Sequence, residues 1–275
     1  MEISWLQSLL YGFISGLTEF LPVSSETHRM LFMHLTGIWV EPPVLRLCVR
    51  LFSALGLVLA CQNTIMRLRY EQRLAAIPPR RRRRNPDTAS ILELRMVKSA
   101  AVPMLIGLVF YIQLNKFLDL LWLQGLMLIL NGIVLYLPQF MLRGNKDSRS
   151  MSGADALAVG LSGALSVIPG VSRIGLIVSA ARMRGADKRF AVEIALLLSV
   201  PMLLGLCLLD FFAMISAEAT ASFLHCLTAS VAAFGGSYFS VQIIRYFGKK
   251  PGFTAFSYYS WGAAFLALIL YLTII

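Results

Sequence analysis

The sequence predicts an all-α integral membrane protein with six transmembrane helices and two re-entrant helical hairpins in an inverted-topology repeat. Three observations predict it. Of the 275 residues, 57% are hydrophobic and only 14% are charged, and the mean hydropathy is +0.72. Twenty of the 25 lysines and arginines fall in four segments. Two apolar stretches contain a proline with polar residues beside it. This composition excludes an ordinary soluble domain.

The apolar stretches approach the length of about 20 residues that a helix needs to cross a bilayer. They run over 4–20 with 29–40, 45–63, 99–114, 119–142, 154–182, 190–216, 221–247 and 254–275. Helices are expected because a bilayer leaves no solvent for unpaired backbone groups. The chain begins Met-Glu-Ile-Ser-Trp without a basic segment, so we expect the first apolar stretch to be retained rather than cleaved as a signal peptide.

The basic segments determine the predicted topology, because basic loops stay on the cytoplasmic side. They lie at 67–98, 143–149, 182–189 and 245–250. Since 154–182 begins and ends beside basic loops, it must enter the membrane and return, with a break at Pro169-Gly170. Working back along the chain, 4–40 becomes a second hairpin, entered from the outer face and broken at Pro22. The alternative of eight plain spans would place basic loops on both sides.

We therefore predict one membrane domain over 1–275. The first repeat covers 1–142 with its hairpin at about 4–40, and the second covers 143–275 with its hairpin at about 154–182. Gly16 to Pro22 and Gly163 to Pro169 share the same spacing, which weakly supports an internal repeat. Inverted repeats with broken helices that meet near the midplane form sites for polar ligands.

The arginine run at 80–84 does not predict nucleic-acid binding. Its place between two spans favours a topology determinant or a contact with anionic lipid headgroups. The four cysteines are scattered through apolar stretches without pairing or metal-ligand spacing, so they are interpreted as small core residues.

The first hairpin carries polar residues that suit phosphate chemistry. Charged groups inside a membrane are costly and are functional candidates by default. Ser25 and His28 are three residues apart, so on a helix after Pro22 they would share a face and the imidazole could act as base or acid. Glu19 could orient His28, receive a proton or hold a divalent cation. Pairing of Glu19 with Arg29 or with another intramembrane arginine is the purely structural alternative.

The second hairpin adds a phosphate-binding group. Arg173 offers a planar fork for two phosphate oxygens, and the turn that contains Gly170 and Ser172 could present backbone N–H groups at a helix start. Each signal alone is weak. Together they predict a site that cleaves a phosphoanhydride without an organic cofactor.

These two segments, Gly-Leu-Thr-Glu-Phe-Leu-Pro-Val-Ser-Ser-x-x-His at 16–28 and Pro-Gly-Val-Ser-Arg-x-Gly at 169–175, closely resemble the undecaprenyl-diphosphatase family linked to bacitracin resistance. The resemblance extends over the whole chain. It implies a phosphatase of the bacterial plasma membrane, with an outward-facing site, that regenerates the undecaprenyl phosphate carrier for peptidoglycan synthesis. It also implies a divalent cation, Mg²⁺ or Ca²⁺.

The resemblance assigns roles to individual residues. The nucleophilic serine falls on Ser25, the histidine on His28, an acidic residue and candidate metal ligand on Glu19, and the phosphate-binding arginine on Arg173. The remaining predicted substrate-binding residues are Ser24, Ser172, Gly170, Arg46 and Arg50.

The chain departs from the family pattern at several positions. Ser15 stands where the family has its first acidic or amide residue, and Glu26 appears in a turn that is usually small. Arg46 and Arg50 replace positions that are usually acidic and amide-bearing. These arginines could hold a lipid phosphate with less help from a metal ion. Glu26 could supply the missing acidic function or neutralise Arg29.

The predicted partners are a polyprenyl diphosphate lipid and the membrane itself, with a homodimer left open. Two other functions stay open. One is a transporter or flippase for a polyprenyl phosphate or another anionic lipid. The other is a catalytically impaired paralogue.

Overall fold

The structure is a computed structural model that describes residues 4–38, 41–114, 117, 120–141, 144–216, 221–250 and 252–274, and within these residues every regular element is helical. The α-helices are α1 (Trp5–Glu19), α2 (Ser25–Thr36), α3 (Pro43–Ala60), α4 (Gln62–Ala76), α5 (Thr88–Leu114), α6 (Leu121–Tyr136), α7 (Gly153–Ala164), α8 (Arg173–Met183), α9 (Lys188–Ile215), α10 (Phe223–Lys249) and α11 (Ala255–Ile274).

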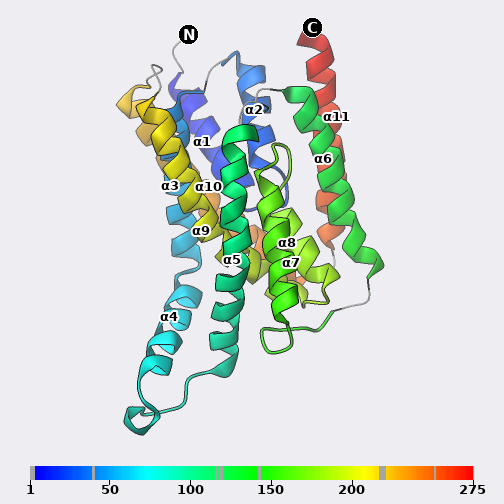
Figure 1. Cartoon of the computed structure of the whole chain (residues 1–275). Helices are drawn as coiled ribbons and strands as arrows, with labels where there is room; N and C mark the ends of the chain where they lie inside the picture. The colour runs from blue at the N-terminus through cyan, green and yellow to red at the C-terminus, as the bar shows by residue number, and fades with distance from the viewer. Residues whose placement is uncertain are drawn as a thin grey trace.

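Six of these helices are long and apolar enough to cross a membrane: α3, α5, α6 with the short turn after it, α9, α10 and α11. The pairs α1–α2 and α7–α8 are different, because none of their helices exceeds 15 residues. A span needs about 20 residues. The prediction of an all-α membrane protein with six spans and two pairs of short helices is confirmed. Both termini lie at the same end of the molecule (Figure 1).

The helices pack in corresponding pairs. In the first half, α1 packs along α10, and in the second half α7 packs along α5. The long helices α3 and α9 contact each other, as do α6 and α11. If each helix of the first half is replaced by its counterpart in the second half, and the reverse, the same set of helix contacts results. An inverted repeat requires this. The predicted repeat boundary at 142/143 lies outside the described residues, as does Arg143 of the second basic segment.

The shared Gly-to-Pro spacing has a packing reason. A Cβ on Gly16 would lie 2.2 Å from the backbone oxygen of Ala233 in α10, and one on Gly12 would lie 2.0 Å from that of Ala229. On the other hairpin, a Cβ on Gly163 would lie 2.9 Å from the Met104 sulfur in α5. Each glycine thus lies where the first helix of its hairpin crosses a span.

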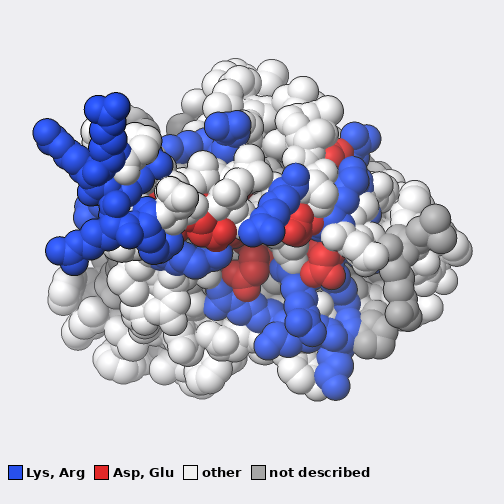
Figure 2. Space-filling view, turned by 90° about the horizontal axis from the view of Figure 1, so that it is seen from below, with Lys and Arg blue, Asp and Glu red and all other residues white. Residues whose placement is uncertain are grey.

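The stretch predicted as a long basic loop is partly helical, and the loop prediction is wrong over α4 and the start of α5. Helix α4 continues beyond α3, away from the end that holds the termini (Figure 1). Its Glu71 pairs with Arg84 of the arginine run, and hydrogen bonding from that guanidinium lowers the pKa of Glu71. Figure 2 shows lysines and arginines spread over the face at this end, which we call the basic face.

Candidate active site

The second helix of each hairpin begins in the same way. Ser24 caps α2 by accepting a hydrogen bond from the Thr27 N–H (3.4 Å), and Ser172 caps α8 by accepting one from the Gly175 N–H (3.2 Å). Serine is a preferred N-cap because its hydroxyl satisfies a backbone donor that the helix leaves free. The caps place Ser25 and Arg173 at equivalent positions, the first residue of each helix.

The tip of the second hairpin requires a glycine. Gly170 has φ +91°, a conformation that side-chain-bearing residues rarely adopt. A Cβ there would also lie 2.6 Å from the Cβ of Met127 and 2.7 Å from the backbone oxygen of Gln124 in α6. Gly170 therefore shapes the turn that starts α8.

One amide side chain ties the two hairpin tips together. Asn131 of α6 donates from Nδ2 to the Pro22 carbonyl (3.2 Å), and its Oδ1 accepts from the Ser172 N–H (3.0 Å). The Ser172 hydroxyl also donates to the Leu21 carbonyl (3.2 Å). Sequence reasoning missed Asn131, although an amide within the apolar stretch 119–142 was the signal. These bonds bring the N-termini of α2 and α8 to one place.

The carboxylate of Glu19, at the end of α1, connects the two hairpins chemically. Its Oε2 accepts a hydrogen bond from the Ser25 hydroxyl at 2.7 Å, and its Oε1 lies 2.8 Å from Nη2 of Arg173. Both charged side chains are nearly buried, with exposed fractions of 9% and 11%. The structure thus brings together three of the residues predicted from the sequence, across 154 positions of the chain.

A small cavity lies beside this triplet. Its volume of about 30 Å³ has room for about one water molecule. Two donors of Arg173, Nε and Nη1, are buried and have no hydrogen-bond partner in the part of the chain that the structure describes, and the Tyr111 hydroxyl in the cavity wall is in the same state. Buried polar groups are almost always paired. Unpaired N–H groups beside the Ser25 hydroxyl therefore mark a place for an acceptor oxygen.

Of the predicted site residues, the cavity wall contains Glu19, Ser24, Ser25, Ser172 and Arg173. Gly170, His28, Arg46 and Arg50 are not among its lining residues. The other polar residues of the wall are Thr18, Glu26, Tyr111 and Ser166. Neither Tyr111 nor Asn131 could be assigned from the sequence, because a single polar residue in an apolar stretch does not reveal which neighbour it faces.

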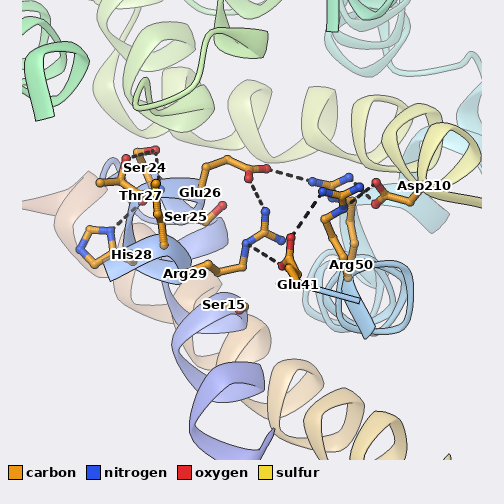
Figure 3. A network of polar contacts seen from close by, with 12 residues as sticks. Ser15, Ser24, Ser25, Glu26, Thr27, His28, Arg29, Glu41, Arg50 and Asp210 are labelled. Carbon is orange, nitrogen blue, oxygen red and sulfur yellow. Dashed lines mark hydrogen bonds and ion pairs between the residues drawn. The ribbon is translucent and has the colours of Figure 1, made fainter. Parts of the chain in front are cut away.

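His28 does not take the place predicted for it. Its Nδ1 lies 2.7 Å from the Ser24 carbonyl oxygen and its Nε2 lies 2.8 Å from the hydroxyl of Tyr259 in α11, whose ring stacks on the imidazole. Figure 3 shows His28 and Ser25 pointing to different sides of α2. No hydrogen bond joins His28 to Ser25 or to Glu19 among the described residues. In this arrangement Glu19, and not His28, contacts the serine.

The arginines predicted to bind substrate belong to a separate charged network (Figure 3). Arg50 pairs with Asp210 and Glu26, and Arg46 lies 3.0 Å from Asp210 and 3.4 Å from Glu41. The network, which we call the arginine network, consists of Arg29, Arg46, Arg50, Glu26, Glu41 and Asp210. Its formal charges balance, so a substrate-binding role for Arg46 and Arg50 finds no support in their contacts.

Glu26 combines the two roles that the sequence left open. It pairs with Arg29 and Arg50, and it also lines the cavity beside Ser25. Ser15, at the position of the missing acidic residue, is buried and donates its hydroxyl to the Tyr11 carbonyl (2.6 Å). The cavity therefore has two carboxylates, from Glu19 and Glu26.

The donor set does not fit a divalent cation held by the protein alone. Both oxygens of Glu19 are engaged, by Ser25 and Arg173, and both oxygens of Glu26 are engaged by arginines. Within the described ranges no group of three His, Cys, Asp or Glu side chains is placed to hold a metal ion. Hard cations prefer several oxygen ligands that cations do not already neutralise.

Fold and site together define a class of protein: a multi-pass membrane protein with a serine, a carboxylate and an arginine at the junction of two helical hairpins. The family of bacitracin resistance protein BacA matches residues 8–266, and this chain belongs to that family.

Curated relatives align along nearly the whole chain. An undecaprenyl-diphosphatase of Carboxydothermus hydrogenoformans is 28% identical over 271 residues, 96% of each chain. An undecaprenyl-diphosphatase 2 of Bacillus thuringiensis is 30% identical over 266 residues, which are 96% of this chain and 97% of the relative. An undecaprenyl-diphosphatase of Halothermothrix orenii is 26% identical over 275 residues, 98% of each.

Proposed function

We propose that this protein is an undecaprenyl-diphosphatase, which removes the terminal phosphate of undecaprenyl diphosphate and releases undecaprenyl phosphate. Membership of the BacA family and the names of the aligned relatives support the activity. In this chain, the observation that supports the activity best is the pair of unpartnered Arg173 donors beside the Glu19–Ser25 hydrogen bond.

In the first step the Ser25 hydroxyl attacks the terminal phosphorus. Glu19 Oε2 lies 2.7 Å from this hydroxyl and accepts its proton as the O–P bond forms. The bond between the terminal phosphorus and the bridging oxygen breaks, and the lipid monophosphate leaves with that electron pair. Since a phosphate is a good leaving group, no second acid is needed for its departure.

The site stabilises the negative charge of the transferring phosphoryl group in two ways. The free Nε–H and Nη1–H groups of Arg173 donate to phosphoryl oxygens, which carry more charge in the transition state. The N-termini of α2 and α8 both begin at the cavity, so their helix dipoles add positive potential.

In the second step water hydrolyses the phosphoserine. The bond between the Ser25 oxygen and phosphorus breaks while protonated Glu19 returns its proton to the serine oxygen. Both protons of the attacking water stay with the released phosphate. The cavity is large enough for about one water molecule beside Ser25. Enzyme and carboxylate return to their starting state.

The same proposal places the protein in a bacterial plasma membrane with its site toward the outer side. Basic loops favour the cytoplasm, and the basic face lies at the end away from the termini (Figures 1 and 2). The cavity lies between the two hairpin tips, within the helical bundle. The polyprenyl chain of a bound substrate could remain among the surrounding apolar helices.

The test is phosphate release from undecaprenyl diphosphate by the purified protein in detergent. Ser25→Ala removes the nucleophile and Arg173→Ala removes the phosphate ligand, so each should lower kcat by roughly 10³-fold. Ser230→Ala is the matched control, because Ser230 is a buried serine of α10 that donates its hydroxyl to the Cys226 carbonyl and does not line the cavity. Unchanged release in Ser25→Ala would reject the nucleophile, and lipid translocation without phosphate release would support a transporter instead.

A further inference from the structure

A second and much larger cavity opens on the basic face. Its volume is about 830 Å³, within the range of ligand sites. It lies among the end of α6, the end of α8, the start of α9, the end of α10 and the turn before α11. We call it the basic cavity. It shares no lining residue with the candidate active site.

The wall of the basic cavity carries an excess of positive charge. Its basic residues are Arg182, Lys188, Arg189, Lys249 and Lys250, and its acidic residue is Asp187. The carboxylate of Asp187 accepts hydrogen bonds from the Arg189 and Phe190 N–H groups as the cap of α9. No ion pair neutralises any of the five cations within the part of the chain that the structure describes.

Two neighbouring cations show the contrast. Lys146 and Arg184 lie close by in the chain segments that border the basic cavity, but neither lines it. Both pair with the buried carboxylate of Asp155, at 3.2 and 2.6 Å. The protein therefore neutralises the basic residues next to the cavity and leaves those inside its wall without a counter-charge.

The cavity is held in a defined shape. The Lys146 N–H donates to the Gly185 carbonyl (3.0 Å), and the Asp187 N–H donates to the Lys146 carbonyl (2.8 Å), so the segment before α7 is tied to the turn between α8 and α9. Lys188 donates to the Lys250 carbonyl and lies over the Phe253 ring at 5.0 Å. These contacts link the ends of α8, α9 and α10 around the opening.

A buried hydroxyl in the wall has no partner. Ser179 of α8 lines the basic cavity, is 1% exposed and makes no hydrogen bond through Oγ within the described residues. A buried hydroxyl without a partner costs free energy. A ligand oxygen that enters the cavity would satisfy it, and this observation is independent of the cations.

The chemistry of the wall selects the kind of ligand. Alongside the cations it contains apolar side chains, among them Leu135, Val178 and Phe253. The cavity also lies at the ends of membrane-spanning helices, where lipid phosphates are concentrated. We propose that the basic cavity binds the phosphate headgroup of an anionic lipid from the leaflet next to the basic face. This proposal does not rest on the proposed phosphatase activity.

The two sites are connected by a single short helix. Arg173 at the start of α8 belongs to the candidate active site, and Arg182 near its end lines the basic cavity. Nine residues of α-helix separate them by about 13 Å along the axis. The proposed lipid site is thus distinct from the active site but shares a rigid element with it.

The test uses phosphatidic acid with a fluorescent acyl chain, titrated with the full-length protein in detergent. The triple variant Arg182→Gln, Lys188→Gln, Arg189→Gln should bind at least about tenfold more weakly, because three of the five cations in the wall are lost. The matched control removes the same charge from the exposed arginine run, as Arg80→Gln, Arg81→Gln, Arg83→Gln, and should bind within about twofold of the unchanged protein. Melting temperature and elution volume verify that each variant is folded.

A milder variant tests the cavity without changing its charge. Ser179→Ala should weaken binding by about threefold, because one hydrogen bond is lost. Competition identifies the source of the phosphate: unlabelled phosphatidic acid should displace the probe, and inorganic phosphate at the same concentration should not. Equal weakening by the two triple variants would overturn the proposal, because it would mean general attraction to a basic surface. Displacement by inorganic phosphate as effective as by phosphatidic acid would overturn the assignment to a lipid.

Discussion

The hairpins α1–α2 and α7–α8 share a backbone plan and differ in chemistry. In both, a proline follows the first helix, a serine caps the second, and the first residue of the second helix faces the cavity. That residue is Ser25 in one hairpin and Arg173 in the other. The two hairpins therefore share the backbone arrangement that points a helix N-terminus toward the cavity. The side chain at this position decides whether the hairpin brings a hydroxyl or a guanidinium to the cavity.

The difference extends to the residue three positions before each proline. In the first hairpin this is Glu19, whose carboxylate contacts both Ser25 and Arg173. In the second it is Ser166, which donates its hydroxyl to the Gly163 carbonyl of its own hairpin (2.6 Å). At this position the first hairpin contacts the second through Glu19, whereas Ser166 bonds within its own hairpin. This difference between the hairpins can be tested by substituting equivalent residues in the two hairpins.

The largest effect on activity in this comparison is expected at Glu19. Glu19→Gln keeps the shape of the side chain but removes the charge that accepts the Ser25 proton and pairs with Arg173, so kcat should fall roughly 10²- to 10³-fold. Ser166→Ala, at the equivalent position, should change kcat by less than about fivefold. Phosphate release measures both. Equal losses in the two variants would mean that the hairpins contribute in the same way.

The packing glycines should differ in a second measurement, thermal stability. Gly16→Ala places a methyl group 2.2 Å from the backbone oxygen of Ala233, which cannot move without shifting α10. Gly163→Ala meets the flexible Met104 side chain at 2.9 Å. We expect Gly16→Ala to cost at least about 3 kcal/mol and Gly163→Ala about 1 kcal/mol. A comparable fall in melting temperature for both variants would contradict this difference.

A smaller effect is expected for His28. Because its imidazole bonds the Ser24 carbonyl and the Tyr259 hydroxyl, His28→Gln should lower kcat by less than about tenfold, and Tyr259→Phe should have a similar effect. The expected loss is that of a positioning residue, whose contacts hold α2 against α11. A loss above about a hundredfold in His28→Gln with normal activity in Tyr259→Phe would show that the imidazole takes part in proton transfer.

The smallest effect is expected from removal of divalent cations. The second hairpin brings no carboxylate to the cavity, and both carboxylates of the first are engaged by arginines or by Ser25. We expect a chelator to lower phosphate release by less than about threefold, because Arg173 and the helix N-termini neutralise the phosphoryl oxygens. Full dependence on added Mg²⁺ or Ca²⁺, restored by titration, would show that substrate binding frees a carboxylate for the metal.

The predicted fold agrees with the structure where the basic loops limit the possible topologies. Basic loops on one side of a membrane leave few topologies, and a stretch such as 154–182, flanked by them, has to return. The sequence could not show that α4 forms within the basic segment. This polar helix is stabilised partly by the pair of Glu71 with Arg84, which lies beyond the end of the helix. The repeat boundaries stay a prediction.

The site was predictable where its residues lie next to a hairpin tip and not elsewhere. Glu19, Ser25 and Arg173 are close to the prolines that break the helices, so their meeting follows from the fold. The position of His28 depends on Tyr259, 231 residues away. The partners of Arg46 and Arg50 include Asp210, whose place beside them is decided by the packing of α9 on α3. Spacing along one helix cannot reveal such tertiary partners.

The arginine network has a consequence for how this sequence can change. Its six members neutralise one another, and removing one partner of a buried ion pair costs about 3–5 kcal/mol. A single substitution toward the usual family residue, such as Arg50→Gln, therefore produces a protein with an uncompensated buried charge. Ancestral reconstruction or consensus engineering should treat the six members of the arginine network as one block, exchanged together or left untouched.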